Sequence, residues 1–474
     1  MALTRRNFLK TGITASACAL ACNDASSPQQ TPNIILIMVD DIGYGEFGCY
    51  GQKIIATPRI DQLAGEGMRF TDFYAGAPVC GPSRCSIMTG LHTGHAPIRG
   101  NARDDVTGVM SLPAGVPTIA EQMKRRTSYT TGMTGRWHLG GEKSNQQPQQ
   151  RGFDYVFGKL SSIFPATKNT PMVKSLFDEQ GCHIPYEEYS RIGNEPIYET
   201  GTLYQLTDKD RSKESLYIDE MVTDKACEFI EAQRDNPFFL YMPYTIAHAP
   251  LDIPSLGRYA DRDWPEVEKA FAASVTLLDS FVGRILDTLE RLGLDDNTVV
   301  LFTSDNGPHR EGGHDETFFN SSGVLQGMKR DLYEGGIRMP MIARWPGQIQ
   351  PGSVTSHMGA FWDFMPTVLD LAGGEIPAET DGLSFAPLLR GEPQAAHEYL
   401  YWEFREGGPK QAIRRGQWKL IRFLDTGRDE LYDVVDDPGE TRDLSVQRPE
   451  LVKELTALMA KARTPSDVFP LPID

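Results

Sequence analysis

The sequence predicts an α/β fold in which helices cover both faces of a large, mainly parallel sheet, followed by a smaller antiparallel sheet with a terminal helix. Three observations lead to this expectation. Apolar runs at 34–39, 237–244 and 298–303 are typical of strands buried on both faces. Residues 265–289 place apolar side chains along one face of a helix. Beyond about residue 394, short strands alternate with turns that contain Gly and Asp.

Polar side chains follow the expected strands at the point where each strand ends. Ligands of parallel sheets bind beyond the carboxyl ends of the strands, so these side chains are expected at one common edge. They are Asp40 and Asp41 after 34–39, Arg136 and His138 after a weaker strand at 129–134, His248 after 237–244, and Asp305 and Asn306 after 298–303.

The C-terminal part is expected to contain short strands at 399–404, 417–423 and 430–434 and a helix at 449–460. We therefore divide the chain into three parts. Residues 1–31 form a targeting segment and linker, residues 32–394 form the main α/β domain, and residues 395–474 form the smaller domain.

Composition limits the class of protein. The 474 residues include 40% apolar and 23% charged residues, the range of an ordinary folded globular protein, and the length allows two or three domains or one large domain with an appendage. Lys and Arg number 47 against 64 Asp and Glu, which gives a net charge of −17. Binding to nucleic acid, which needs clustered cations, is therefore not expected.

The N-terminus resembles an export signal. Residues 4–10, TRRNFLK, match the twin-arginine pattern, and the mild apolar stretch at 11–21 is too short to span a bilayer. We expect export by the twin-arginine machinery to the periplasm or the cell surface, with no transmembrane helix. Residues 19–22, ALAC, are a loose lipoprotein cleavage site, so a lipid anchor on Cys22 stays open.

Seven cysteines, at positions 18, 22, 49, 80, 85, 182 and 227, are too few and too scattered for a disulfide framework. Five of them remain after residues 1–31. An odd number leaves at least one unpaired in an oxidising compartment, and Cys80 has a separate reason to be that one.

That reason is the motif Cys80-Gly-Pro-Ser-Arg84, which continues to Thr89-Gly90. The chain resembles the type I sulfatases of the alkaline phosphatase superfamily, whose Cys-x-Pro-Ser-Arg signature marks a cysteine that is oxidised to formylglycine by a maturation enzyme. The resemblance covers residues 32–445. It implies an alkaline phosphatase-like fold and hydrolysis of a sulfate ester through a covalent sulfo-enzyme intermediate.

The residue types around position 80 suit this chemistry. Pro82 fits the first turn of a helix, so residue 80 is expected at a helix N-terminus, where free N–H groups favour an anion such as sulfate. A hydrated formylglycine carries two hydroxyls, one to attack sulfur and one to expel sulfate later. Arg84 is expected to orient residue 80.

Acidifying such a hydroxyl requires a divalent cation with oxygen ligands. Asp40, Asp41, Asp305 and Asn306 supply them, and an all-oxygen set favours Ca²⁺ or Mg²⁺ over zinc. The resemblance places the metal on these four residues together with residue 80 and favours Ca²⁺.

Three further elements match family motifs. Gly135-Arg-Trp-His-Leu-Gly140 is similar to the family's Gly-Lys-Trp-His-Leu-Gly, which implies that Arg136 contacts sulfate and that His138 bonds the formylglycine hydroxyl. Arginine at 136 departs from the family lysine and exchanges a point charge for a planar fork. His248 and Lys329 match the family positions that act on the leaving alcohol oxygen.

Polar residues on neighbouring Gly-rich loops are candidates for substrate binding, and they would suit a sulfated carbohydrate: Arg99, Asn101, His309, Arg310, His314 and Asp315. Two alternatives stay open. One is a phosphomonoester or phosphonate monoester hydrolase, since related enzymes use the same modified cysteine. The other is a non-catalytic protein that binds sulfated glycans, for which the arginine at 136 is the only support.

Overall fold

The computed structural model describes residues 31–101, 110–140, 144, 146–160, 217–249, 251 and 253–474, together with four short strands between 160 and 217. The predicted export signal, with Cys18 and Cys22, lies outside the described residues, as do Cys182 and Pro250. Residues 31–474 form one compact unit. No helix in the described ranges is long and apolar enough to cross a bilayer.

The main sheet has the strand order β12-β2-β11-β10-β1-β9-β3-β4-β7-β8, with β13 beside β2. Its centre, from β10 to β4, is parallel, whereas β11 and β7 add antiparallel neighbours on either side. A mainly parallel sheet was expected, and it is confirmed. Its strands are β1 (Asn33–Val39), β2 (Met68–Tyr74), β3 (Thr130–Arg136), β4 (Tyr155–Lys159), β7 (Ile197–Glu199), β8 (Thr202–Tyr204), β9 (Phe238–Pro243), β10 (Thr298–Ser304), β11 (Arg338–Arg344), β12 (Ser353–Thr355) and β13 (Gly359–Ala360). A separate pair consists of β5 (Leu176–Phe177) and β6 (His183–Ile184).

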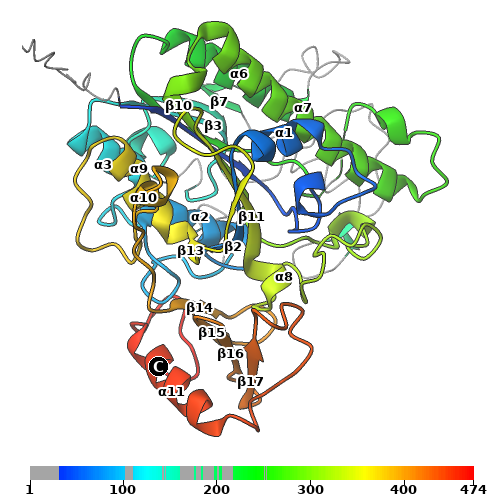
Figure 1. The fold of residues 1–474 in the computed structure, drawn as a ribbon, viewed down its shortest axis with the longest axis vertical. Coiled ribbons are helices and arrows are strands. Elements are labelled where there is room, and N and C mark those ends of the chain that lie inside the picture. The colour runs from blue at the N-terminus through cyan, green and yellow to red at the C-terminus, as the bar shows by residue number, and fades with distance from the viewer. Residues whose placement is uncertain are drawn as a thin grey trace, which may run out of the picture. The chain divides into compact units, whose positions relative to one another are not determined.

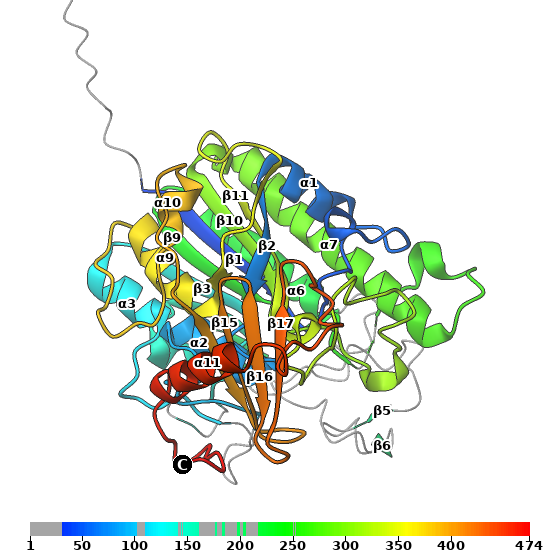
Figure 2. The same cartoon turned by 60° about the horizontal axis from the view of Figure 1, so that its bottom comes forward.

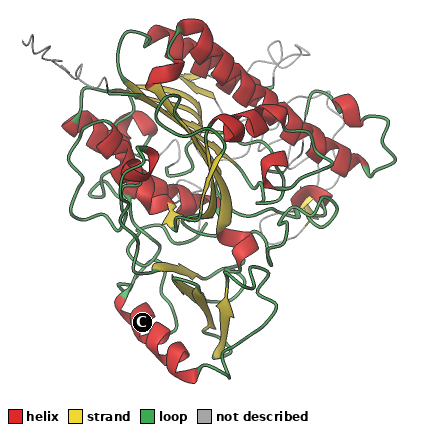
Figure 3. Ribbon diagram, in the orientation of Figure 1, coloured by secondary structure: helices red, strands yellow, loops and turns green. Residues whose placement is uncertain are grey.

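Helices lie on both faces of this sheet (Figures 1 and 3). The side chains of β1 alternate between two cores. Ile35 and Ile37 pack with α1 (Pro58–Glu66), α6 (Ile218–Ala232) and α7 (Glu266–Leu292). Leu36 and Met38 belong to the core formed with α2 (Cys80–Thr89), α3 (Ile119–Arg126), α9 (Phe364–Leu371) and α10 (Ala386–Leu389). Burial on both faces explains why the strand is apolar at every position from Ile34 to Val39.

The C-terminal part is an antiparallel sheet with the order β14-β15-β16-β17 (Figure 2). One face of this sheet packs on α11. On the other face, Trp402 packs with Tyr74 of β2, a strand of the main sheet, and with Ile337. The sheet plus terminal helix agrees with the sequence analysis, although β15 was not expected. The elements are β14 (Leu400–Phe404), β15 (Lys410–Arg415), β16 (Trp418–Phe423), β17 (Arg428–Asp433) and α11 (Pro449–Lys461), after the short α8 (Glu334–Ile337).

Candidate active site

Four buried oxygen-bearing side chains meet at the carboxyl ends of β1 and β10. These strands pair in parallel and end at the same level, which brings Asp40 and Asp41 beside Asp305 and Asn306. All four residues have no exposed surface. The Asn306 amide donates to Asp41 Oδ1 at 2.6 Å. The sequence prediction that these residues share one edge agrees with this geometry.

Two non-glycine residues of the site, Asp41 and His138, have a left-handed backbone with φ of 61° and 59°. Such conformations cost of order 1–3 kcal/mol and persist only where the surroundings hold them. The backbone N–H of Asp41 donates to Asp305 Oδ1 at 3.1 Å, and that of Ile42 donates to Ser304 Oγ at 3.0 Å. Tertiary hydrogen bonds thus fix the direction in which the Asp41 carboxylate points.

Cys80 is the first residue of α2 and lies beside this oxygen set. Ser83, in the first turn, donates its hydroxyl to the backbone carbonyl of Asp305 at 2.6 Å and ties the helix to the end of β10. Asn101 Oδ1 accepts from the backbone N–H of Gly81 at 3.0 Å, and its Nδ2 lies 3.6 Å from Cys80 Sγ. A helix N-terminus at this place favours bound anions.

Arg84 of α2 and Arg136 of β3 form ion pairs with these carboxylates. Arg84 Nη2 lies 2.9 Å from both Asp40 Oδ2 and Asp305 Oδ2, and its Nη1 donates to the carbonyl of Arg136 at 2.7 Å. Burial raises the pKa of Asp40, but the guanidinium groups of Arg136 and Arg84 outweigh burial and hold that pKa below its usual value. The described contacts of Arg84 are therefore with two carboxylates and the carbonyl of Arg136, and its role toward residue 80 stays a prediction.

Arg136 is the last residue of β3, and His138 lies two residues further along the chain. Arg136 Nη1 donates to Asp40 Oδ2 at 2.7 Å, and Nη2 lies 3.5 Å from His138 Nε2. Burial, and then the Arg136 charge, lower the pKa of His138 well below its usual value, so its imidazole is neutral. A neutral imidazole can accept a proton, but the lowered pKa makes it a weaker base, and the role of His138 as the base stays a prediction.

Lys329 and His248 lie on the other side of Asp41. Lys329 Nζ is 2.7 Å from Asp41 Oδ2 and 3.4 Å from His248 Nε2. His248 Nδ1 lies 2.5 Å from the carbonyl of Ala249, which can only accept, so Nδ1 carries the proton and Nε2 faces Lys329 as an acceptor. The two residues predicted to act on the leaving group are thus adjacent.

Glu311, which the sequence analysis missed, completes this side of the site. Its Oε2 lies 3.0 Å from Lys329 Nζ and 3.8 Å from His248 Nε2. Glu311 begins a short 3-10 turn (Glu311–Gly313) in the Gly-rich loop that also holds the basic candidates for substrate binding. An acidic residue close in sequence to Asp305 and His309 could have indicated a role for Glu311. Its partner Lys329 lies 18 residues away, however, so the sequence does not show that the two residues meet.

The oxygen set fits a divalent cation. Asp40 Oδ1 and Asn306 Oδ1 are buried and have no hydrogen-bond partner among the residues described. Ligand atoms of Asp40, Cys80 and Asp305 lie within 4.8 Å of one another. Burial and the neighbouring Asp40 carboxylate raise the pKa of Asp305 to about 8, and a bound cation would oppose that rise. Asp40, Asp41, Asp305 and Asn306 are therefore the residues that would hold the metal.

Three buried candidates for substrate binding have structural partners instead. Arg99 Nη1 donates to Glu403 Oε1 at 2.6 Å, and its Nε donates to the carbonyl of Ala96. His314 Nδ1 lies 2.8 Å from Glu268 Oε2, and His309 Nε2 lies 3.1 Å from the carbonyl of Ala247. His314 Nε2 still has no partner among the described residues, and a ring nitrogen of His309 lies within 4.8 Å of carboxylate oxygens of Asp41 and Glu311, so a part in substrate binding stays a prediction.

The exposed candidates also bond locally. Arg310 forms an ion pair with Glu316, and the Asp315 carboxylate accepts from the backbone N–H and the hydroxyl of Thr317. Asn101 is the exception, since it contacts Cys80. Of the six candidates, Asn101 is the one that the structure places against the nucleophile position.

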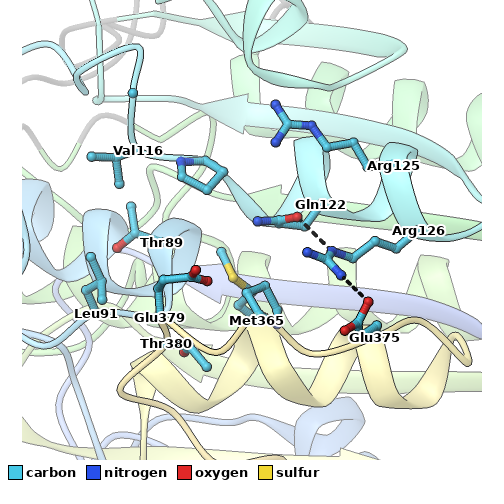
Figure 4. Close-up of a pocket in the computed structure, with 13 residues that line it drawn as sticks. Thr89, Leu91, Val116, Gln122, Arg125, Arg126, Met365, Glu375, Glu379 and Thr380 are labelled. Atoms are coloured by element: carbon cyan, nitrogen blue, oxygen red, sulfur yellow. Dashed lines mark hydrogen bonds and ion pairs between the residues drawn. The ribbon is translucent and has the colours of Figure 1, made fainter.

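A pocket of about 860 Å³ lies at the opposite end of α2, where Thr89 rather than Cys80 is the lining residue (Figure 4). A ten-residue helix separates the two places by about 15 Å. Arg126 in this pocket donates to Gln122 and Glu375, each at 2.9 Å. Its charge is already paired, and we assign the pocket no part in the chemistry.

Fold and site together are those of an α/β protein whose buried oxygen ligands, helix N-terminus and cationic side chains suit a divalent cation and an anionic ester. The family model described as "Sulfatase" matches residues 32–374, and the model described as "N-sulphoglucosamine sulphohydrolase, C-terminal" matches residues 327–464. The chain belongs to the sulfatase family and is a sulfuric ester hydrolase. The resemblance carried by residues 80–84 is thereby confirmed.

Relatives support this over nearly the whole chain. N-acetylgalactosamine-6-O-sulfatase of Bacteroides thetaiotaomicron is 31% identical, with 93% of this chain and 95% of the relative covered. Human arylsulfatase A is 33% identical, with coverages of 90% and 87%. The crystal structure of Ps i-CgsB in complex with k-i-k-neocarrahexaose has a TM-score of 0.76 and 28% identity, with 91% and 92% covered.

Proposed function

We propose that this sulfatase removes sulfate from a carbohydrate, with residue 80 as formylglycine and Ca²⁺ as the metal. The observation that carries the proposal is the position of Cys80, at the N-terminus of α2 and beside the buried oxygens of Asp40 and Asp305. The carbohydrate is supported by the Bacteroides relative, whose name gives N-acetylgalactosamine-6-O-sulfate as its target, and by the solved relative in complex with neocarrahexaose.

The proposal extends to the cellular location. The twin-arginine pattern at residues 4–10 supports export to the periplasm, or to the cell surface if Cys22 is lipidated. Conversion of Cys80 would also require a maturation enzyme as a partner. These steps precede catalysis and do not involve the groups described below.

Different residues of the site would perform different steps of the hydrolysis. A bound divalent cation would acidify a hydroxyl on residue 80 and neutralise sulfate oxygens. Arg136 and Lys329, on opposite sides of the carboxylates, place two positive charges where sulfate would lie. The neutral His138 accepts a proton from a hydroxyl of residue 80. Lys329 donates to the departing alcohol oxygen, and His248 lies beside its ammonium group.

Counting the buried charges supports an anionic substrate. The carboxylates of Asp40, Asp41 and Asp305 face the cationic groups of Arg84, Arg136 and Lys329. With Asp305 ionised by a bound cation, these three negative and three positive charges balance, so the divalent cation would give this group of six residues a positive net charge. A sulfate ester brings the compensating negative charge into a buried place where the attraction is strong.

The test uses protein purified from its native host. Peptide mass analysis around residue 80 should show the loss of the thiol in favour of an aldehyde, and sulfated oligosaccharides should release sulfate. A chelator should abolish release, and Ca²⁺ should restore it better than Mg²⁺ does. An unmodified thiol at full activity, or activity that survives metal removal, would contradict the proposal. Faster hydrolysis of aryl phosphate than of aryl sulfate would instead indicate the phosphoester alternative.

A further inference from the structure

The ammonium group of Lys329 is surrounded by three acceptors. Its Nζ lies 2.7 Å from Asp41 Oδ2, 3.0 Å from Glu311 Oε2 and 3.4 Å from His248 Nε2. An ammonium group has three N–H donors, and each of them has one of these partners. Lys329 is buried, with 4% of its surface exposed, so its position depends on these contacts rather than on water.

Two of the three acceptors differ from Glu311 in their role or in their charge. Asp41 belongs to the oxygen set that would hold the metal, and the imidazole ring of His248 carries no negative charge. Glu311 is the remaining anionic partner of Lys329 within the part of the chain that is described. Its carboxylate is therefore the charge that holds the ammonium group on the side away from the metal.

Glu311 is itself held firmly. Its second oxygen, Oε1, accepts from Arg330 Nη1 at 2.8 Å, so one carboxylate bridges two consecutive basic residues. Arg330 has a left-handed backbone, with φ of 77°, and its N–H donates to the carbonyl of Pro78 at 2.9 Å. The loop that carries Lys329 is thus fixed to the segment that immediately precedes Cys80.

The C-terminal sheet supports the same loop. Lys410 on β15 donates to the carbonyl of Arg330 at 3.0 Å, and Glu406 Oε2 lies 3.7 Å from Arg330 Nε. Glu406 Oε1 also accepts from the backbone N–H of Asn101 at 2.7 Å. Glu406 therefore contacts both Asn101, which lies beside Cys80, and Arg330, which follows Lys329 in the sequence.

We propose that Glu311 is a positioning residue that holds Lys329 where the departing alcohol oxygen leaves the sulfur. The inference rests on the proposed sulfatase function. Glu311 does not need to touch the substrate, because it acts through the ammonium group of Lys329. Its contribution should grow with the need of the leaving group for a proton or a cationic hydrogen bond.

The experiment compares two substrates of different leaving-group strength, a sulfated sugar and 4-nitrophenyl sulfate, in the mature protein. Glu311→Gln should lower kcat/KM for the sugar by about 100-fold, the lower end of the effect of a well-placed acid, and for the nitrophenyl ester by less than about 5-fold. Nitrophenolate leaves without protonation, whereas a sugar alkoxide does not. A purely structural change would affect both substrates alike.

Glu316→Gln is the matched control. Glu316 lies in the same loop, its side chain is 12% exposed against 14% for Glu311, and it also pairs with an arginine, Arg310. The control should leave kcat/KM for both substrates at the wild-type value. If Glu311→Gln does not fold, Glu311→Asp keeps the charge one methylene further from Lys329 and should show the same selective loss at smaller size.

A double-mutant cycle with Lys329→Ala separates the possible outcomes. Once Lys329 is absent, Glu311→Gln should cause no further selective loss on the sugar. Equal losses on both substrates, no loss on either, or an undiminished selective loss without Lys329 would overturn the positioning role. A wild-type protein that releases sulfate from neither substrate would instead count against the proposed function itself.

Discussion

Two clusters of buried charge can be compared in residues 31–474. The site cluster comprises the residues at the ends of β1, β3 and β10 together with Arg84, Glu311 and Lys329. The interface cluster joins the main sheet to the C-terminal sheet, and its members are Asp72, Tyr74, Glu334, Arg338, Arg414, Lys419 and Glu440. In the interface cluster, Lys419 lies 2.9 Å from both Glu334 and Glu440, and each charged member has a partner of opposite charge.

The difference lies in what each cluster leaves unpaired. The site cluster keeps buried atoms without a hydrogen-bond partner among the residues described, namely Asp40 Oδ1, Asn306 Oδ1 and His138 Nδ1. In the interface cluster, Glu440 Oε1 also lacks a hydrogen bond but has the Lys419 ammonium group as its ion partner. Buried charge alone therefore does not mark a catalytic site. Charge that is incompletely paired, held in a strained backbone and placed beside a nucleophile does so.

The largest effect is expected at Cys80, because the comparison makes it the reacting group. Cys80→Ala should lower sulfate release by more than about 10⁴-fold, since loss of a nucleophile removes the whole covalent route. Denaturant unfolding should be almost unchanged, and Cys80→Ser is the matched variant, which keeps one hydroxyl and removes the thiol on which maturation would act. Activity of Cys80→Ala near the wild-type rate would show that residue 80 is not the nucleophile.

The two clusters also differ in how far the sequence predicts them. The ligand residues follow strands that are apolar throughout, so β1 and β10 and the side chains that follow them were predicted correctly in type and order. The strands β2, β11 and β15 were not expected, because each carries charged residues at buried positions, such as Asp72, Arg338 and Arg414. Those charges are satisfied only by partners that lie far apart in the sequence.

Glu334 shows the same limit. In the sequence it looks like part of a turn, together with Gly335 and Gly336. In the structure it begins α8, has no exposed surface, and accepts from the hydroxyl of Tyr74 at 2.6 Å and from Lys419 at 2.9 Å. Its partners lie 260 and 85 residues away in the sequence, so no local sequence pattern predicts these contacts. The role of Glu311 was not predicted either, because its partner Lys329 is also not a local neighbour in the sequence.

A charge deletion in the interface cluster should affect stability rather than catalysis. Lys419→Met leaves the carboxylates of Glu334 and Glu440 buried without their shared cation, which should lower the free energy of unfolding by about 3–5 kcal/mol. Denaturant titration of the purified variant measures this. In the site cluster, Lys329→Met should cost less stability, because Glu311 keeps Arg330, but far more activity. Similar stabilities of the two variants would remove the distinction between the clusters.

The pH dependence of stability sharpens the comparison further. Burial, opposed by Lys419 but reinforced by Glu334, raises the pKa of Glu440 to about 7 from a usual 4.5. A carboxyl group with a raised pKa in the folded state stabilises the protein only at low pH, and this contribution is lost as pH rises from 4.5 to about 7. Glu440→Gln should remove that loss.

Relative to wild type, the Glu440→Gln variant should therefore gain about 3 kcal/mol in free energy of unfolding between pH 4.5 and pH 8, because each pH unit between the unfolded and folded pKa values contributes about 1.4 kcal/mol. Denaturant titrations of both proteins at several pH values give this difference. A difference that stays constant across the range would mean that Glu440 titrates normally and that the interface cluster is not strained by its second carboxylate.

The smallest effect concerns the departure from the family lysine at position 136. The fork of Arg136 reaches Asp40 Oδ2 at 2.7 Å and His138 Nε2 at 3.5 Å, and a single ammonium group cannot occupy both places. Arg136→Lys should therefore loosen His138 and lower kcat/KM by about 10-fold, or about 1.4 kcal/mol, the scale of one charged hydrogen bond. Steady-state sulfate release measures it, with Arg310→Lys on the exposed loop as the control. Activity above wild type would mean instead that the arginine impairs a site in which lysine performs better, as expected of a protein whose main role has shifted toward binding glycans.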